Sequence, residues 1–428
     1  MKLLFTGPED CHDVFGRLHF GAESLRVVGP ATGLPPMRPR CAVPEPDGSW
    51  LLYGGSGGHD EPWRIWRART FDGLHYEGAE CVFQSEPGGW LGELDIAHNA
   101  GDGSLLCLKW HRGRTGHAVL AFGSEDGSAW RPLAAGPVYV DHDAFGLMWE
   151  PRTRRYVCYQ TTYQRWAKRY EDNIGRDTRR VLHVRTSADG VAWEPAADVP
   201  WAGPYMPAER LVTPDADDPE DIEFYRFCGF PYADRYAGMM LIYCPSPHAA
   251  NPRYPWTKHG PHLGGEWWIS ADGARWRRPY RAVFAPGRAP GVIEHGPMDL
   301  GGRHLWVIGG TVCGLPASRL FFVASRANAE FSTRPFVMPS GPLAVHAALG
   351  FDGDDQRGMM GQGYVMAELC QEHGSVIAGY ERERCVLRHL DGDAVRLLWG
   401  AADGSALAGQ VVRLRLCCRD ARIYAVTA

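Results

Sequence analysis

The sequence lacks any long apolar run, and it carries little net charge. No segment reaches the ~18 unbroken apolar residues of a membrane-spanning helix, and the start, MKLLFTGPEDCHD, is too polar for a secretory signal. The formal net charge of -5 over 428 residues gives no electrostatic reason to expect nucleic acid or an anionic membrane as a partner. We therefore expect a cytoplasmic protein whose partner is a small neutral or polar molecule.

Cysteine pairs with the spacing of metal or redox motifs are also missing. Twelve cysteines are present, without CxxC spacing and mostly within apolar, strand-like runs. Such cysteines are typical of buried reduced thiols in a cytoplasmic protein. We expect no cofactor and no structural metal.

Turn-forming and aromatic residues are abundant. The chain has 52 Gly, 32 Pro, 16 Trp, 17 Tyr and 16 Phe, a composition suited to short strands joined by tight turns, so we expect little helix. Its length of 428 residues exceeds the ~250 to 300 residues at which one hydrophobic core usually stops growing. Two domains are therefore expected.

One short phrase recurs four times and predicts the architecture. The aspartates of its copies are 54, 63 and 83 residues apart, and each copy follows two strand-like runs. Asp-Gly supplies the positive-φ turn of a hairpin, and the aromatic residue three positions after Asp folds back onto that hairpin. Repeats of this length indicate four-stranded propeller blades. The copies are TFDGLHY (70–76), SEDGSAW (124–130), SADGVAW (187–193) and SADGARW (270–276).

A fifth unit and a C-terminal segment with a different strand pattern complete the predicted fold. RHLWVIGG followed by RLFFVASRANAEF has two strands and a degraded turn, which makes five blades within about 330 residues. After Pro335, six or more short alternating strands without the phrase indicate a small antiparallel β-sandwich. The prediction is an all-β chain, with a five-bladed β-propeller over residues 1–334 and a C-terminal β-sandwich over 335–428.

Three stretches carry a resemblance to a known group of enzymes. DDPEDIEFYRFCGFPYADRYAGMMLIY (217–243), SADGARWRRPY (270–280) and the closing LDGDAVRLLWG...SALAGQVVRLRLCCRDARIYA (390–425) resemble the invertase-like and arabinanase-like glycoside hydrolases. The likeness is closest to bacterial proteins of the family thirty-two-like type. It covers nearly the whole chain and implies a propeller followed by a sandwich. The invertase runs Asn-Asp-Pro-Asn and Arg-Asp-Pro are absent, so no catalytic residue is assigned by motif.

Polar residues near the starts of the five predicted inner strands give the candidate site. Inner strands of a propeller begin near the central axis on one face, so these side chains should converge on one pocket. Acidic residues recur at this position in four of the five blades. The candidates, blade by blade, are Arg38 and Arg40; Glu93 and Asp95; Asp141, His142 and Asp143; Asp221 and Glu223; and Glu294, His295 and Asp299.

Glycosidic hydrolysis needs one carboxylic acid and one carboxylate, and these candidates supply both. In the resembled enzymes the three working acids lie on blades one, three and four. Asp95, Asp221 or Glu223, and Glu294 repeat that spacing shifted by one blade. We assign Asp95 as base or nucleophile and Glu294 as acid. Supporting acids are Asp143 and Glu223, and Arg38 and Arg40 orient the substrate. The alternative is that such aspartates cap turns or bind backbone N–H groups.

Histidines and an aromatic loop complete the candidate set. His98, His142 and His295 are read as hydrogen-bonded pocket residues, with an axial metal as the alternative. Trp256 and Tyr254 lie in a Pro-rich insertion (245–265) that is a candidate lid, and either could stack on a sugar or cover a blade edge. The run DDPED (217–221) lacks the spacing of a calcium-binding loop.

The leading hypothesis is a glycoside hydrolase that acts on a small glycoside or oligosaccharide, with a furanoside as one substrate class. A non-catalytic carbohydrate-binding propeller would use the same acids only to accept hydrogen bonds from hydroxyl groups. A protein-interaction propeller would instead present an apolar or strongly charged open face. The sequence leaves open the sugar, the linkage, the stereochemical outcome and the oligomeric state.

Overall fold

The computed structural model describes the chain apart from residues 58–60, 87–92, 114–115, 168–176, 195–210, 219–221, 244–261, 281–291, 351–362 and 389–390. For residues 112–113, 116–117 and 262–264 it describes the backbone alone. The described residues form strands and three short 3-10 helices, Pro8–Asp10, Arg382–Arg384 and Ser405–Leu407. This confirms the prediction of an all-β protein with little helix. None of the described helices has the length and apolar character needed to cross a membrane.

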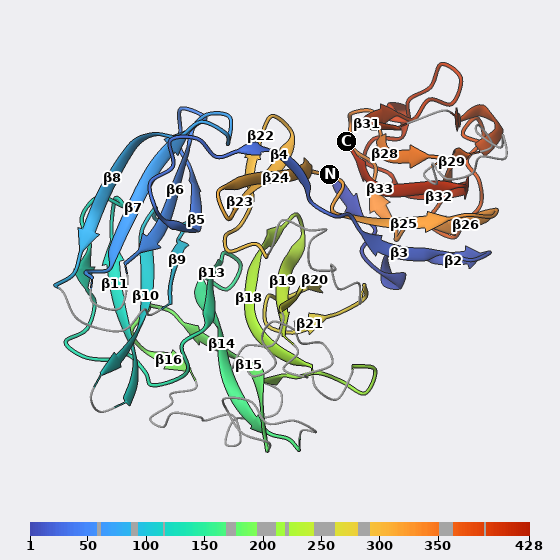
Figure 1. Cartoon of the computed structure of the whole chain (residues 1–428). Coiled ribbons are helices and arrows are strands. Elements are labelled where there is room, and N and C mark those ends of the chain that lie inside the picture. Colours follow the sequence, from blue (N-terminus) through green and yellow to red (C-terminus); the bar gives the residue numbers. More distant parts are fainter. Residues whose placement is uncertain are drawn as a thin grey trace. The chain divides into compact units, whose positions relative to one another are not determined.

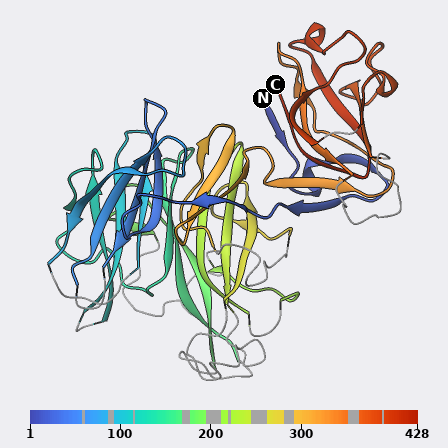
Figure 2. The same cartoon turned by 45° about the horizontal axis from the view of Figure 1, so that its top comes forward.

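The chain folds into two compact units (Figures 1 and 2). The larger unit is Leu25–Gly314, and the smaller unit combines Met1–Ser24 with Leu315–Ala428. Each has its own sheets and its own hydrophobic clusters. Each unit is therefore described by itself.

The larger unit contains five antiparallel sheets among its described residues. Four of them are built mainly from strands consecutive in sequence: β5 (Arg38–Pro44), β6 (Trp50–Ser56), β7 (Arg64–Thr70) and β8 (Glu77–Gln84); β9 (Leu94–His98), β10 (Leu105–Gly113), β11 (Gly116–Ser124) and β12 (Arg131–Pro132); β13 (Phe145–Glu150), β14 (Arg155–Arg165), β15 (Thr178–Ser187), β16 (Trp193–Glu194) and β17 (Leu211–Val212); and β18 (Glu223–Tyr232), β19 (Arg235–Tyr243), β20 (His262–Ser270) and β21 (Trp276–Arg277).

The fifth sheet joins two distant parts of the chain. It consists of β22 (Met298–Leu300), β23 (Arg303–Ile308), β24 (Thr311–Pro316) and, at its edge, β4 (Arg26–Pro30). In the β4–β24 pair, Val27 lies opposite Cys313. The start of the larger unit is thus hydrogen-bonded to its end.

The first strands of neighbouring sheets lie against one another, as Figure 1 shows for β5, β9, β13 and β18. The approach of β13 to β18 is close, because a Cβ on Gly146 would lie 1.8 Å from the carbonyl oxygen of Phe227. Only glycine fits there, since a side chain would collide with backbone. This inner group of strands carries the candidate residues.

The four repeated phrases form the Asp-Gly hairpin turns that the sequence predicts. The hydroxyl of the first residue accepts the glycine N–H at 2.8 or 2.9 Å, and the aspartate Oδ1 accepts the next two backbone N–H groups. Each glycine has φ between 72° and 77°, which favours glycine. Hydrogen bonds from the Ser128 hydroxyl and from two backbone amides lower the pKa of Asp126 to about 2. The phrase is structural.

The aromatic residue of the phrase also has a structural role. In three copies its polar tip donates to the carbonyl of the turn glycine: Tyr76 to Gly73 at 3.0 Å, Trp193 to Gly190 at 2.9 Å, and Trp276 to Gly273 at 3.1 Å. The ring is thereby folded back onto its hairpin, as the sequence predicts.

The smaller unit contains two six-stranded sheets among its described residues, and both contribute to one core. That core includes Phe5, Val345, Ile423, Leu369 and Leu414, all nearly or fully buried. One sheet has β1 (Lys2–Leu4), β3 (His19–Ala22), β25 (Phe321–Ser325), β28 (Ala344–Leu349), β31 (Asp391–Arg396) and β33 (Ala421–Thr427). The other has β2 (His12–Phe15), β26 (Ala329–Ser332), β27 (Phe336–Val337), β29 (Tyr364–Gln371), β30 (Val386–Arg388) and β32 (Val411–Arg419).

The division between the units differs from the predicted boundary at 334/335. Residues 1–24 and 315–334, which we expected in the propeller domain, belong to the smaller unit. RLFFVASRANAEF, interpreted as part of a fifth blade, forms β25 and β26, which pair with β33 and β32. The alternating pattern of these strands suits any half-buried sheet, so it could not identify their partners.

Glu150, at the end of β13, joins two sheets and predicts a pH effect. It accepts hydrogen bonds from Arg152 N–H, from Thr153, and from the Tyr236 hydroxyl on β19. Burial opposes the charge, but these hydrogen bonds outweigh it and lower the pKa of Glu150 to about 2. A depressed pKa gives stability that is present above the unfolded-state value and lost as the pH falls.

We expect Glu150→Gln to lower the free energy of unfolding at pH 7 by on the order of 2 kcal/mol. The difference from wild type should shrink as the pH falls from about 4.5, the ordinary value, towards about 2. Urea unfolding at several pH values measures it, with Glu125→Gln at an exposed pair with Arg131 as the control. A difference that is constant with pH would contradict this account.

Candidate active site

Three arginines and two glutamates meet near the starts of the inner strands. Arg38 donates to Glu93 at 3.2 Å and to Glu294 at 2.9 Å. Arg40 donates to Glu93 at 2.6 Å and lies 3.5 Å from Glu294. Arg226 Nη1 donates to Glu93 Oε2 at 2.9 Å and to Glu294 Oε1 at 3.1 Å. Arg38, Arg40 and Glu294, which are far apart in the sequence, are thus brought together, and their predicted roles in substrate binding and catalysis stay predictions.

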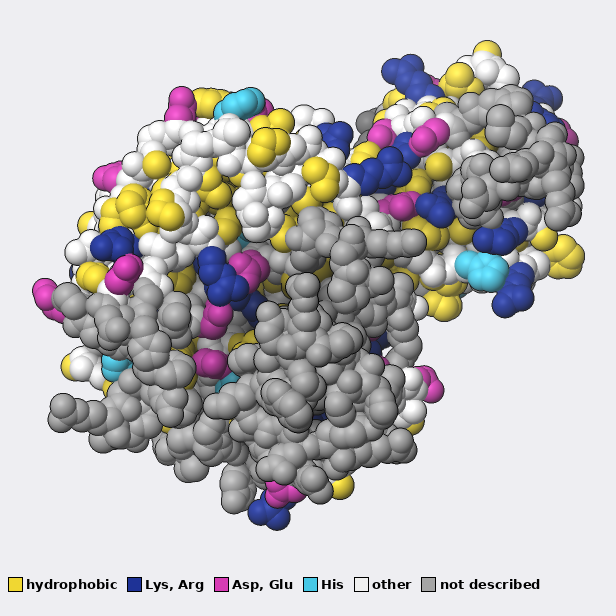
Figure 3. Space-filling view, in the orientation of Figure 1, with side chains coloured by type: hydrophobic (Ala, Val, Ile, Leu, Met, Phe, Trp, Pro, Cys, Tyr) yellow, Lys and Arg dark blue, Asp and Glu magenta, His cyan; other side chains and the backbone are white. Residues whose placement is uncertain are grey.

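β-Bulges help to place two of the arginines. In β5 the register shifts between Pro39 and Cys41, so Arg40 is the extra residue. In β18 it shifts between Phe224 and Arg226, which changes the side of the sheet to which the following residues point. Both arginines are nearly fully buried, whereas Arg38 is exposed. Figure 3 shows basic and acidic side chains side by side on the face of the larger unit.

Asp95 is more buried than Glu93, and both of its carboxylate oxygens accept hydrogen bonds from backbone amides. Its Oδ1 accepts Ile96 N–H at 2.9 Å, and its Oδ2 accepts Leu147 N–H on β13 at 3.0 Å. Burial raises the pKa of Asp95 well above its ordinary value, although Arg40 and the two amides oppose the rise. This is the arrangement expected of an aspartate that ties two inner strands together. Its predicted role as base or nucleophile stays a prediction.

Glu93, Glu294 and Asp143 are partly open to solvent, so a ligand could reach them. The exposed fraction of the side chain is 25% for Glu93, 21% for Glu294 and 36% for Asp143. Asp143 lies 2.5 Å from Nδ1 of His142. Burial opposes the charge of Asp143, but the hydrogen bond and charge of His142 outweigh it and lower the pKa of Asp143.

Two further candidate carboxylates are buried, and each is paired with a buried arginine. Glu223 accepts from Arg180 at 2.6 Å, and both side chains are almost wholly buried. Asp141 accepts from Arg185 at 2.7 Å, and burial raises the pKa of Asp141 in spite of that pair. Neither acid reaches the open surface. The predicted supporting role of Glu223 is therefore limited to acting through other residues.

The predicted histidines have separate environments. His295 is buried, its Nδ1 lies 2.6 Å from the Gly296 carbonyl and its Nε2 accepts Val307 N–H at 2.9 Å, so it supports backbone. Burial lowers the pKa of His295 to about 4 and also lowers that of His98. No group of three or more His, Cys, Asp or Glu side chains suited to a metal occurs among the described residues.

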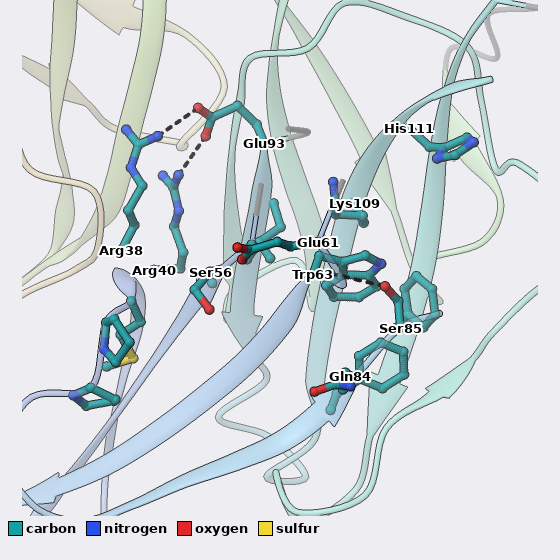
Figure 4. Close-up of a pocket in the computed structure, with 18 of the residues that line it drawn as sticks. Arg38, Arg40, Ser56, Glu61, Trp63, Gln84, Ser85, Glu93, Lys109 and His111 are labelled. Atoms are coloured by element: carbon teal, nitrogen blue, oxygen red, sulfur yellow. Dashed lines mark hydrogen bonds and ion pairs between the residues drawn. The ribbon is translucent and has the colours of Figure 1, made fainter. Parts of the chain in front are cut away.

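A cavity of about 1130 Å³ opens beside the arginine and glutamate cluster. Arg38, Arg40 and Glu93 line one end, and Trp63, Lys109 and His111 lie at the other (Figure 4). A smaller cavity of about 170 Å³ touches Asp95, His98, Glu294 and His295 along the inner strands. The larger cavity is big enough for a small-molecule ligand, for which ~300 to 1,000 Å³ is typical.

The remaining predicted site residues lie either outside the described residues or away from the cluster. Asp221, Tyr254 and Trp256 lie outside the described residues, and Asp299, on β22, is exposed. The sequence interpretation preferred Asp95 to its neighbour Glu93 and did not consider Arg226, Lys109 or Trp63. Glu93 was among the candidates and could have been preferred to Asp95, because it lies two residues before Asp95 and therefore nearer the strand start. Arg226 had no such signal, because its orientation follows the bulge.

Comparison with known proteins gives only distant likeness. No protein-family model and no curated protein matches the sequence. Solved structures that match this chain include a glycosyl hydrolase from Bacteroides ovatus, at 12% identity and TM-score 0.40, with coverage of 66% of this chain and 85% of that one. A family 117 glycoside hydrolase of Zobellia galactanivorans has 11% identity, TM-score 0.39, and coverage of 72% and 90%. A fructofuranosidase of Schwanniomyces occidentalis complexed with fructose has 10% identity, TM-score 0.36, and coverage of 95% and 97%.

These similar structures are glycoside hydrolases by name. At such low TM-scores and identities the likeness carries no argument about the chemistry of this chain.

Proposed function

We propose that the larger unit is a five-bladed β-propeller, that the smaller unit is a β-sandwich, and that the chain is a glycoside hydrolase. Its substrate is a small glycoside or oligosaccharide, with furanosides the first class to test. The five sheets with their first strands together support the propeller. The eleven described cysteines are all free, which supports action in the cytoplasm.

The observation that carries this proposal is the shared contact of Glu93 and Glu294. One nitrogen of Arg226 binds an oxygen of each, at 2.9 and 3.1 Å. Because both oxygens bind one nitrogen, they lie at most about 6 Å apart, compared with carboxyl separations of ~5 to 5.5 Å in retaining glycosidases and ~6.5 to 9.5 Å in inverting ones. Close carboxyl groups favour a retaining mechanism, in which one attacks the anomeric carbon and the other serves as acid and then base.

The cavities favour one assignment of the two roles. Glu93 lines the large cavity, which has room for a leaving group, whereas Glu294 lines the smaller one. Glu93 would donate its proton to the glycosidic oxygen while Glu294 forms the bond to the anomeric carbon. Glu93 would then take a proton from water as that water releases the sugar from Glu294.

The arginines and Asp143 have roles consistent with this chemistry. Arg38 is exposed and bonds both glutamates, so it is the group that a substrate hydroxyl would displace. The buried Arg40 and Arg226 hold the two carboxylates in place. Asp143, an open acid whose pKa is lowered, is suited to accept a hydrogen bond from a sugar hydroxyl.

One observation favours a second candidate, a non-catalytic carbohydrate-binding propeller. Both Glu93 and Glu294 are ion-paired with three arginines, and a site that only accepts hydrogen bonds needs no free acid. A hydrolase would turn over its substrate, whereas a binding propeller would bind the sugar without cleaving it.

Hydrolysis of nitrophenyl glycosides and of fructo-, arabino- and xylo-oligosaccharides tests the proposal. We expect turnover of at least one substrate, and proton NMR in the first minutes should show a product with the anomeric configuration of the substrate. Initial release of the opposite anomer would contradict the retaining mechanism. Sugar binding without any turnover would support the binding propeller instead.

A further inference from the structure

The large cavity has an aromatic end that the proposed hydrolysis does not yet use. Trp63 precedes β7, Phe83 lies on β8 and Phe122 on β11, and all three line the cavity. The ring centroids are 4.6 Å apart for Trp63 and Phe83, 5.1 Å for Trp63 and Phe122, and 5.3 Å for Phe83 and Phe122. Three rings from three elements therefore form one apolar wall.

The wall is held in place by backbone contacts. Trp63 N–H donates to the Ser85 hydroxyl at 3.1 Å, and Ser85 N–H donates to the Trp63 carbonyl at 3.0 Å. Phe122 is buried, whereas Trp63 and Phe83 are half-buried and keep surface for a ligand. A fixed, partly open aromatic surface loses little conformational entropy when a flat ligand binds to it.

Lys109 brings a buried positive charge to the same end (Figure 4). Its side chain is almost fully buried, and its Nζ donates to the Trp110 carbonyl at 2.8 Å and lies 5.8 Å from the centre of a Trp63 ring. Burial lowers the pKa of Lys109 to about 8. An ammonium group has three N–H donors, and the described residues offer Nζ one hydrogen-bond acceptor.

A buried cation with spare donors is costly unless an acceptor joins it. An oxygen anion on a ligand that enters the cavity would supply that acceptor, and a charged acceptor makes the stronger bond. The ligand would also have to cover the aromatic wall. A flat ring that carries a carboxylate meets both conditions.

We propose that this end of the cavity binds an aromatic leaving group bearing a carboxylate, with its ring against Trp63 and its carboxylate on Lys109. The inference rests on the proposed function, because it names the leaving group of the same reaction. Lys109 lines the same cavity as Glu93, the proposed proton donor, although at its other end, whereas Glu294 does not line this cavity. A group held there would leave from the side of the proton donor.

Binding of 4-methoxybenzoate to the full chain, measured by isothermal titration calorimetry, tests the subsite without any catalysis. Cyclohexanecarboxylate keeps the charge without the aromatic ring, and 4-methoxybenzyl alcohol keeps the ring without the charge. We expect both to bind more weakly. Lys109→Met should weaken 4-methoxybenzoate binding by roughly tenfold or more, and Trp63→Leu by roughly three- to tenfold.

Matched variants separate the subsite from a loss of folding. Lys109→Arg keeps the charge and should retain more affinity than Lys109→Met, and Trp166→Leu, at an exposed tryptophan outside this cavity, should leave binding unchanged. Thermal unfolding of each variant identifies any that does not fold, and Trp63→Phe replaces Trp63→Leu if the latter fails. Equal affinities for all three ligands, or binding unaffected in a folded Lys109→Met variant, would overturn the proposal.

A kinetic comparison distinguishes failure of the subsite from failure of the proposed function. For the sugar that is turned over, the 4-carboxyphenyl glycoside should have a lower KM than the 4-methylphenyl glycoside, and Lys109→Met should remove the difference. Hydrolysis without that difference overturns the subsite and leaves the hydrolase intact. Selective binding of 4-methoxybenzoate without hydrolysis of any glycoside overturns the hydrolase and leaves the subsite.

Discussion

Glu93→Gln and Glu294→Gln should each lower kcat by roughly 10²–10⁴-fold on glycosides with poor leaving groups. Glutamine keeps the size of the side chain and can still accept a hydrogen bond, but it neither donates a carboxylic proton nor attacks a sugar carbon. The two variants should differ with the leaving group. Glu93→Gln should recover much of its activity on a dinitrophenyl glycoside, which needs no protonation, whereas Glu294→Gln should not.

Steady-state kinetics of both variants on a series of leaving groups measure this difference. Glu80→Gln is the matched control, because Glu80 is an exposed glutamate on β8 that also pairs with an arginine, Arg67, at 2.8 Å. It should retain wild-type kcat. Wild-type turnover in either Glu93→Gln or Glu294→Gln would remove that residue from the mechanism. If Asp95→Asn were the only variant with a lowered kcat, Asp95 would be the base or nucleophile, as the sequence predicts.

Arg180→Met should lower the free energy of unfolding by about 3–5 kcal/mol. Arg180 and Glu223 are joined at 2.6 Å with almost no exposed surface on either side chain. Removing the arginine takes away the cation that lies 2.6 Å from the buried Glu223 carboxylate, so the desolvation cost of that charge is less fully offset. Urea unfolding followed by tryptophan fluorescence measures the loss.

Two further variants show whether the effect belongs to the pair. Arg67→Met, at the exposed pair with Glu80, should cost less than about 1 kcal/mol. Arg180→Met combined with Glu223→Leu should recover most of the lost stability, because no uncompensated charge remains. A double variant as unstable as the single one would show that Arg180 stabilises through packing rather than through the charge of Glu223.

Local chemistry made part of the fold predictable. Ser187, Asp189, Gly190 and Trp193 satisfy one another within a single turn, so the phrase that contains them could be read without knowing any distant contact. The same holds for its other copies. Strand partners were different: β25 has the alternation of any half-buried strand, and only the whole fold decides that it pairs with β33.

The candidate site could be predicted in position but not in detail. Arg38, Arg40 and Glu294 meet because the starts of inner strands converge, and that follows from topology alone. Which carboxylate is open differs over two residues of the chain, since Glu93 is partly exposed while Asp95 accepts hydrogen bonds from two backbone amides. The position of Arg226 depends on a bulge, and bulges leave no reliable mark in a sequence.

The pairing of β4 with β24 has a consequence for how the chain is made. Val27 emerges from the ribosome about 280 residues before its partner Cys313, a delay of roughly 15 to 60 s at ~5–20 residues per second. β1 waits longer still, because it pairs with β33 at the other end of the chain. The strands in the first thirty residues are made first and wait for partners that lie about 280 or more residues later, so during synthesis they present unpaired strand edges that a chaperone could cover.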